Sequence, residues 1–351
     1  MLTVPDDCSR VRNTALELLL LSHTATVTDV RRRRRRVPQN RLGELRRPSS
    51  ARSLWCRLTM AQPSISRWKS EDAKQRFHAL EQAIWDDHGY PPPEPLDVPT
   101  WAGSTRVYRW RGEGEPIVLL HGMGGTGLTW GPYVEELVGH DLYAVDTIGD
   151  VGRSEQTALI ADADDLARWL DETLAGAGIE HAHLVGTSYG GYLALNLAAR
   201  TPQRVASITL IDAGGLSPFR FGRFMLWGLP NLLAWKAPGP IRRAMARTRP
   251  LLDDPRLMKF ALLGQTNHPF RLPQPVELSD DQLRSITVPA TVVIAARSAP
   301  FEPRLAAQRA ALIPGAVIDV VDGAGHEVMW THVDRCVAHV ERHSTGDGDR
   351  P

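Results

Sequence analysis

Short apolar segments alternate with longer amphipathic segments along most of this 351-residue chain, and this alternation restricts the fold more than any other feature. Runs of Val, Ile and Leu predict strands, whereas apolar residues spaced by three or four predict helices. Because the strand-like runs are apolar throughout, they are typical of a parallel sheet that helices cover on both faces. The sequence therefore predicts an α/β fold with a mostly parallel, doubly wound sheet.

The elements of this fold can be placed along the chain from the same patterns. We expect a hairpin of residues 98–101 and 105–110, followed by strands at 116–120, 142–145, 183–185, 205–211, 291–295 and 317–321. We expect helices at 70–88, 130–137, 162–177, 189–200 and 303–312, and a last helix from about residue 331. Residues 60–212 and 287–345 therefore form the predicted core, and 346–351 form a short tail.

Residues 213–286 interrupt the alternation. This segment is rich in Pro, Arg and aromatic residues, and it contains helical stretches without a clear strand. An insertion of this length is too long for a plain loop between two strands. We interpret it as a helical cap over the carboxyl edge of the sheet, although its aromatic side chains could also pack a small core of their own.

The first 59 residues differ in composition from the rest. They hold 13 Arg, no Lys and five acidic residues, for a net charge of +8, and Arg31 to Arg36 are consecutive. Such a run repels itself and resists folding. A basic arm for nucleic acid or anionic lipid and a targeting peptide are two alternatives. The segment lacks interleaved aromatic residues, an amphipathic period and a cleavage site. We expect a disordered tail or translated upstream sequence, with Met60 as the natural start.

Composition excludes several classes of protein. The chain is 42% hydrophobic and 23% charged, so it can bury a core, and its net charge of +1 argues against general nucleic-acid binding. Its three cysteines are too scattered for a disulfide framework or a thiolate zinc site. No apolar run reaches the ~18–20 residues of a membrane span. We therefore expect a cytoplasmic protein with a small-molecule partner, no nucleic acid, membrane, metal or cofactor partner, and an undetermined oligomeric state.

The strongest chemical signal is Gly186-Thr187-Ser188-Tyr189-Gly190, which lies between a predicted strand and a predicted helix. In this context G-x-S-x-G forms a tight turn that lifts the serine hydroxyl above the sheet. The amino terminus of the following helix favours negative charge that develops there. Ser188 is therefore the predicted nucleophile, and a serine that only caps the helix is the alternative.

Two other loops fit the same chemistry. His121-Gly122-Met123 ends an earlier strand, and the backbone N–H groups of Met123 and Tyr189 could bind an oxyanion. His326 ends the glycine-rich loop 322–326, after the last strand, from which it could reach Ser188. We expect His121 to shape its loop rather than take part in catalysis.

These motifs and their order resemble the α/β-hydrolase family, from about residue 68 to 343. The resemblance rests on the His-Gly loop with Trp130, the segment 144–154, the Ser188 turn and Gly-Ala-Gly-His at 323–326. It is greatest to capped serine esterases, perhydrolases and carbon–carbon-bond hydrolases. The resemblance implies a Ser–acid–His triad in that chain order and no cofactor.

The acid of this triad is the point where the sequence departs from the family. The family usually places a carboxylate just after the penultimate strand, where this chain has Ser298. Glu302 lies four residues further on, and Asp212 ends the strand 205–211. We favour Asp212, because a residue at a strand end is rigidly held. Asp212 could instead only cap its loop.

Two alternative functions remain open from the sequence. Gly122, Gly124 and Gly127 fit the G-x-G-x-x-G pattern of NAD-binding proteins, with Asp146 about 20 residues later. This reading leaves Ser188 and His326 unexplained. Ser298 at the acid position also permits a hydrolase-like binding protein without turnover. The preferred hypothesis is a serine hydrolase that cleaves an ester or a similar acyl bond of a small, partly apolar substrate through an acyl-enzyme.

Overall fold

The computed structural model describes residues 64–234, 237–246, 249, 252 and 254–344. The chain divides into two units, Met1–Leu58 and Thr59–Pro351, and the description below concerns the second unit alone. The Arg-rich segment 1–59 and the tail 346–351 lie outside the described residues, so their interpretation stays a prediction.

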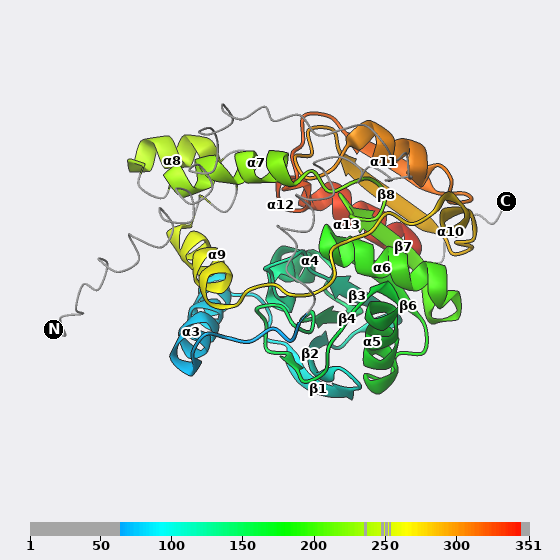
Figure 1. Ribbon diagram of the computed structural model, residues 1–351, viewed down its shortest axis with the longest axis horizontal. Helices are drawn as coiled ribbons and strands as arrows, with labels where there is room; N and C mark the ends of the chain where they lie inside the picture. The colour runs from blue at the N-terminus through cyan, green and yellow to red at the C-terminus, as the bar shows by residue number, and fades with distance from the viewer. Residues whose placement is uncertain (1–63, 235–236, 247–248, 250–251, 253, 345–351) are drawn as a thin grey trace, which may run out of the picture. The chain divides into compact units, whose positions relative to one another are not determined.

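A nine-stranded sheet forms the centre of this unit, as Figure 1 shows. Its order is β1-β2-β4-β3-β6-β7-β8-β9, with β5 paired to β2. The pairs from β4 to β9 are parallel, and β1, β2 and β5 make the antiparallel pairs. The strands are β1 Glu94–Thr100, β2 Gly103–Trp110, β3 Glu113–Leu120, β4 His140–Val145, β5 Glu155–Gln156, β6 Ala182–Thr187, β7 Val205–Ile211, β8 Ala290–Ala295 and β9 Val317–Val321. The predicted fold class is confirmed.

Helices cover both faces of the sheet. They are α3 Glu71–His88, α4 Gly131–Glu136, α5 Ala163–Gly176, α6 Tyr189–Arg200, α7 Phe221–Ala234, α8 Gly239–Ala246, α9 Pro255–Asn267, α10 Asp280–Arg284, α11 Pro303–Ala310, α12 Val328–Thr331 and α13 Val333–Ser344. The insertion between β7 and β8 thus contains α7, α8, α9 and α10.

Local sequence explains where several helices begin. The Ser70 hydroxyl accepts a hydrogen bond from Ala73 N at 3.2 Å and starts α3, and Gly89 ends this helix with a φ of 69°. Asp162 caps α5 by accepting from the N–H groups of residues 164 and 165. The predicted spans of these two helices, 70–88 and 162–177, differ from the observed ones by at most one residue at either end.

Two predicted helices differ from the structure, and one strand was not predicted. The helix expected at 130–137 is shorter, because a 3-10 turn, Gly127–Trp130, precedes α4. The last helix is split at His332, whose φ of −139° and ψ of 49° are not helical. The strand β5 was not expected, because two residues are too few to show a periodic pattern.

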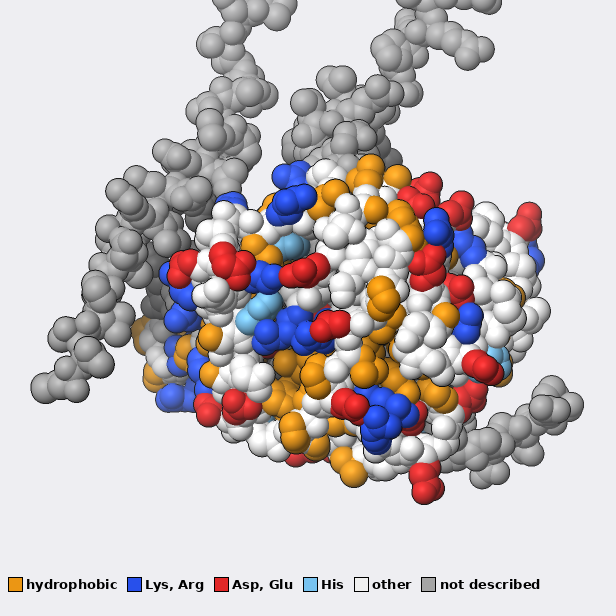
Figure 2. Space-filling view, turned by 90° about the horizontal axis from the view of Figure 1, so that it is seen from below, with side chains coloured by type: hydrophobic (Ala, Val, Ile, Leu, Met, Phe, Trp, Pro, Cys, Tyr) orange, Lys and Arg blue, Asp and Glu red, His pale blue; other side chains and the backbone are white. Residues whose placement is uncertain are grey.

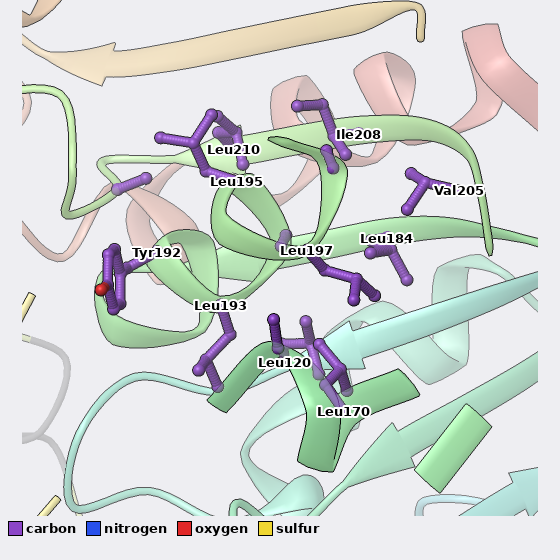
Figure 3. Close-up of a cluster of buried hydrophobic side chains, with 14 of the residues drawn as sticks. Leu120, Leu170, Leu184, Tyr192, Leu193, Leu195, Leu197, Val205, Ile208 and Leu210 are labelled. Carbon is purple, nitrogen blue, oxygen red and sulfur yellow. The ribbon is translucent and has the colours of Figure 1, made fainter. Parts of the chain in front are cut away.

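The apolar side chains of α6 fill one layer of the core. Figure 3 shows Leu193 and Leu197 of α6 beside Leu120 of β3 and Leu170 of α5, and all four are essentially inaccessible to solvent. Each such side chain contributes about 1.5–3 kcal/mol relative to its exposed state. A second layer, on the opposite face, packs α4 and α13 against the sheet. The sheet that carries the site is therefore fixed on both faces.

Candidate active site

The turn between β6 and α6 presents Ser188 at the carboxyl edge of the sheet. Ser188 has a φ of 52° and a ψ of −111°, which places it outside the regular regions of backbone space. The turn is tight enough to require glycine on both sides. A Cβ at Gly186 would lie 2.4 Å from Gly190 O, and a Cβ at Gly190 would lie 2.0 Å from Leu120 O.

Backbone strain marks a second residue beside this turn. Asp212, which directly follows β7, has a φ of 43°. Among the described non-glycine residues, only Asp212 and Ser188 have a positive φ. Ser188 N donates to Ile211 O at 3.1 Å, and Gly214 N donates to Ser188 O at 2.9 Å. The two strained positions are thus held together by the backbone on either side of Asp212. Such conformations cost about 1–3 kcal/mol each and cluster at functional sites.

The Asp212 carboxylate contacts His326. Nδ1 of His326 lies 2.6 Å from Oδ2 of Asp212, which also accepts a 2.7 Å hydrogen bond from Ser298 Oγ. The Asp212 side chain is 2% exposed and that of His326 is 14% exposed. A hydrogen bond to a buried carboxylate fixes the ring tautomer, with the proton on Nδ1 and a free lone pair on Nε2.

The alternative acid, Glu302, lies in a different environment. Its carboxylate pairs with the Arg220 guanidinium, and its backbone N–H donates to Ser217 Oγ at 3.1 Å. Glu302 precedes Pro303 at the start of α11 and is about two-fifths exposed. Its ion-pair partner and its position as a helix cap explain why a carboxylate occurs there.

The His-Gly loop packs directly against the serine. A Cβ at Gly122 would lie 3.3 Å from Ser188 Cβ. His121 is fully buried, and its Nε2 accepts a 2.9 Å hydrogen bond from Thr147 N while Nδ1 faces its neighbour's carbonyl. His121 therefore shapes the loop, as the sequence predicted. Among the described residues, no acceptor is found for the backbone N–H of Met123 or of Tyr189.

Asp150 supports this loop and was not singled out from the sequence. Its carboxylate accepts from Gly124 N at 2.9 Å and from Val151 N at 2.8 Å. Burial raises the pKa of Asp150 to about 6, and the nearby His121 works against this rise. The only sequence signal for Asp150 is its place within the family-like segment 144–154.

The NAD-binding alternative requires Asp146 to reach a ribose. Instead, Asp146 is fully buried, and its carboxylate accepts 2.6 Å hydrogen bonds from the N–H groups of Gly127 and Arg153. The residues after Gly127 form a 3-10 turn rather than an α-helix that could face a pyrophosphate. The glycine pattern is therefore explained by loop packing, and this alternative is wrong.

Aromatic side chains surround the imidazole of His326. The ring centroids of Phe301, Trp227 and Phe224 lie 5.7, 6.0 and 6.5 Å from that of His326. Trp227 and Phe224 come from α7, in the insertion between β7 and β8. The imidazole is thus bordered by apolar surface.

A cavity of about 380 Å³ lies to one side of these groups. Its lining comes from α3, the 3-10 turn, α9 and α12, and includes Glu81, Trp85, Thr126, Phe260 and Trp330, without Ser188 or His326. Glu81 is buried, with Arg153 Nη2 at 3.4 Å from its Oε2. Desolvation, together with the charge of Asp146, raises the pKa of Glu81 to about 8.

Comparison with known proteins identifies the family of this chain. The model of the alpha/beta hydrolase family matches residues 117–339. This chain belongs to the alpha/beta hydrolase family. It is therefore an α/β-hydrolase enzyme. The chain is 26% identical over 286 residues to carboxylesterase YbfK of Bacillus subtilis, and the match covers 76% of this chain and 92% of that protein.

Other relatives of this hydrolase are also named for hydrolytic reactions. It is 28% identical over 243 residues to N-formylmaleamate deformylase of Pseudomonas putida, covering 64% of this chain and 87% of that protein. The crystal structure of naproxen esterase from Bacillus subtilis superposes with a TM-score of 0.66 at 24% identity, covering 78% of this chain and 98% of the other. This structural likeness shows the fold alone.

The described part of the hydrolase shows neither a metal-binding cluster nor a membrane-spanning helix. Within it, no three His, Cys, Asp or Glu side chains gather where they could hold a metal ion. In the same part, no helix combines the length and the hydropathy that crossing a membrane requires.

Proposed function

We propose that this hydrolase is a serine esterase that cleaves an ester or a similar acyl bond of a small, partly apolar substrate through an acyl-enzyme. The 2.6 Å contact between His326 Nδ1 and the buried Asp212 carboxylate carries this proposal. This contact orients the imidazole as a base at the same edge of the sheet where the strained turn presents Ser188. The carboxylesterase and deformylase relatives support the same reaction class.

The first half-reaction forms the acyl-enzyme. Ser188 Oγ attacks the carbonyl carbon while His326 Nε2 takes the serine proton. Asp212 keeps the ring in its Nδ1–H tautomer and stabilises the imidazolium. As the tetrahedral intermediate collapses, His326 returns that proton to the leaving alcohol, and the acyl group stays on Ser188.

The second half-reaction releases the acid. His326 now takes a proton from water, whose oxygen attacks the acyl carbon. The second intermediate collapses, and the proton moves from His326 to Ser188 Oγ. The enzyme returns to its starting state without a cofactor in either step.

The oxyanion of both intermediates would be bound by the backbone N–H groups of Met123 and Tyr189. Gly122, which precedes Met123, packs on Ser188. Tyr189 directly follows Ser188 and is the first residue of α6. Each such donor is typically worth about 2.7–4 kcal/mol of transition-state stabilisation. The dipole of α6 adds to this effect.

The shape of the substrate follows from the surroundings of His326. Phe301, Trp227 and Phe224 place apolar rings around the imidazole, which suits an apolar group beside the scissile bond. We propose that the insertion 213–286, which supplies two of these rings, acts as a helical cap.

A binding protein without turnover is the alternative, because Ser298 occupies the usual position of the acid. The 2.7 Å bond from Ser298 Oγ to Asp212 favours the enzyme, since it makes Ser298 a partner of a carboxylate that lies on the neighbouring strand.

Labelling with a fluorophosphonate probe separates the two functions. The full-length protein should be labelled at Ser188 and should hydrolyse p-nitrophenyl esters in a panel of increasing acyl length. Asp212→Asn should lose both labelling and turnover, since the attack of Ser188 on the probe and on the ester depends on an oriented His326. A folded protein that neither reacts with the probe nor turns over any ester would support the binding protein.

A further inference from the structure

The helix α7 is apolar on two opposite faces. Phe224 and Trp227 face inward, since their rings lie against His326. With 3.6 residues per turn, Met225, Leu226 and Leu229 lie on the other side of the helix, and Phe221 lies between the two faces. A helix at the edge of a globular protein normally turns polar residues to solvent. The outer face of α7 departs from this rule.

The outer face is exposed over a continuous surface. Phe221, Met225, Leu226 and Leu229 are 54%, 53%, 70% and 41% exposed, and Ile241 of the neighbouring α8 is 53% exposed. Val138 and Leu159, two exposed apolar side chains elsewhere in the described residues, lie in separate loops. Contiguous exposed apolar surface of this kind marks an interaction site. We call these five residues the α7 surface.

The segment that carries the α7 surface is basic, although Asp253 and Asp254 follow it directly and Glu302 pairs with its Arg220. Residues 213–252 contain seven Lys and Arg and no Asp or Glu, in a chain that has 41 basic and 40 acidic residues overall. Arg223 and Arg243 of this segment are exposed. On the face of the molecule in Figure 2, by contrast, acidic and basic side chains are interspersed.

We propose that the α7 surface docks onto an anionic phospholipid surface. Helices that lie in a lipid interface combine Phe, Trp, Leu or Met on one face with Arg and Lys near the headgroups, and α7 and α8 offer this combination. No membrane-spanning segment is needed for such docking.

Charge complementarity selects lipid over the other possible occupants of this surface. A second copy of the chain would bring two segments of the same positive sign together. The Arg-rich segment 1–59, with its net charge of +8, would be repelled in the same way. An anionic lipid surface supplies both an apolar layer for the five side chains and negative headgroups for the arginines.

Docking through α7 would bring the lipid surface close to the active site. Because the inner face of the helix borders His326, a molecule dissolved in lipid would need to pass only one helix to reach the site. The protein would then draw apolar substrates from a membrane surface rather than from water.

Vesicle partitioning tests the proposal on the full-length chain. We compare the wild type, Met225→Asp/Leu226→Asp, and the charge-matched control Val138→Asp/Leu159→Asp, by titrating mixed phosphatidylcholine–phosphatidylglycerol vesicles. The α7 variant should partition at least about tenfold more weakly than the wild type, whereas the control should match it. The Arg-rich segment is present in all three proteins and contributes equally.

Two further measurements complete the test. Arg223→Gln/Arg243→Gln should lose about fivefold in affinity for each arginine on the anionic vesicles, and nothing on pure phosphatidylcholine. Melting curves verify that all variants are folded. Equal partitioning of the α7 variant and its control would overturn the proposal. So would a wild-type dimer that the Met225→Asp/Leu226→Asp change converts to a monomer, because the surface would then join two copies.

Discussion

Nδ1 of His326 lies 2.6 Å from Oδ2 of Asp212, although 114 residues separate them in the chain. The contact forms because Asp212 directly follows β7 and His326 follows β9. These strands are parallel, so their carboxyl ends lie at the same edge of the sheet. Ser298, which follows the intervening strand β8, donates to the same carboxylate oxygen. One oxygen of Asp212 thus joins loops from three neighbouring strands.

Ser188→Ala tests the nucleophile. Without the hydroxyl no acyl-enzyme can form, so we expect ester turnover and fluorophosphonate labelling to disappear. The fold should persist, since Ala fits the space of Ser, and a melting curve verifies this. Undiminished turnover by the folded Ala variant would contradict the assignment.

Asp212→Asn and Glu302→Gln together test the triad acid. The Asn variant should lose about 10⁴-fold in kcat, because its amide stabilises the wrong tautomer of His326 and no longer balances the imidazolium charge. Glu302→Gln breaks only the pair with Arg220, so its kcat should stay within about threefold of the wild type.

The same assay on one soluble ester includes Ser298→Ala. This variant removes one hydrogen bond to a charged oxygen, which is typically worth about 1.5–3 kcal/mol, and we expect a loss between those of the other two variants. A larger loss in Glu302→Gln than in Asp212→Asn would reverse the assignment of the acid.

Gly190→Ala tests the packing of the serine turn. The new Cβ would lie 2.0 Å from Leu120 O, so strand β3 and helix α6 would have to separate, and we expect a strongly destabilised or insoluble protein. Gly228→Ala is the matched control, since no atom lies within 4 Å of the added Cβ. The control should be slightly stabilised, by roughly 0.4–1 kcal/mol, in a denaturant titration. Similar stabilities for the two variants would contradict the turn geometry.

Glu81 makes the stability of the fold depend on pH. Its pKa is about 8 in the folded state against 4.5 for an ordinary glutamate, mainly because of burial. Between these two pH values the unfolded chain is ionised while the folded chain keeps the proton. The free energy of unfolding should therefore fall as pH rises from about 4.5 to 8, and level off above that range.

Glu81→Gln removes this titration. The variant should show a flatter dependence of unfolding free energy on pH across the same range, whereas Glu71→Gln, an exposed position on the same helix, should follow the wild type. Parallel curves for the wild type and Glu81→Gln would show that Glu81 ionises normally in the folded protein.

The sequence was sufficient wherever a local pattern determines the conformation. The span of β7, 205–211, and that of α6, 189–200, follow from apolar runs and periodicity that involve only neighbouring residues. Ser188 could be proposed as the nucleophile for the same reason, because the glycines that its tight turn requires lie within two residues of it. The family-like order of the loops then placed His326 and the His-Gly loop.

The environment of each carboxylate depended on tertiary structure. Asp212 and Glu302 both follow strands, and nothing within a few residues of either says which one meets an imidazole. The fold decides, because Arg220 from the insertion pairs with Glu302, while the strand order sets Asp212 between Ser298 and His326. The raised pKa of Glu81 has the same origin. Helical periodicity predicted its helix, but only the packed fold brings Asp146 near it and excludes water, since both effects join residues that are distant in the chain.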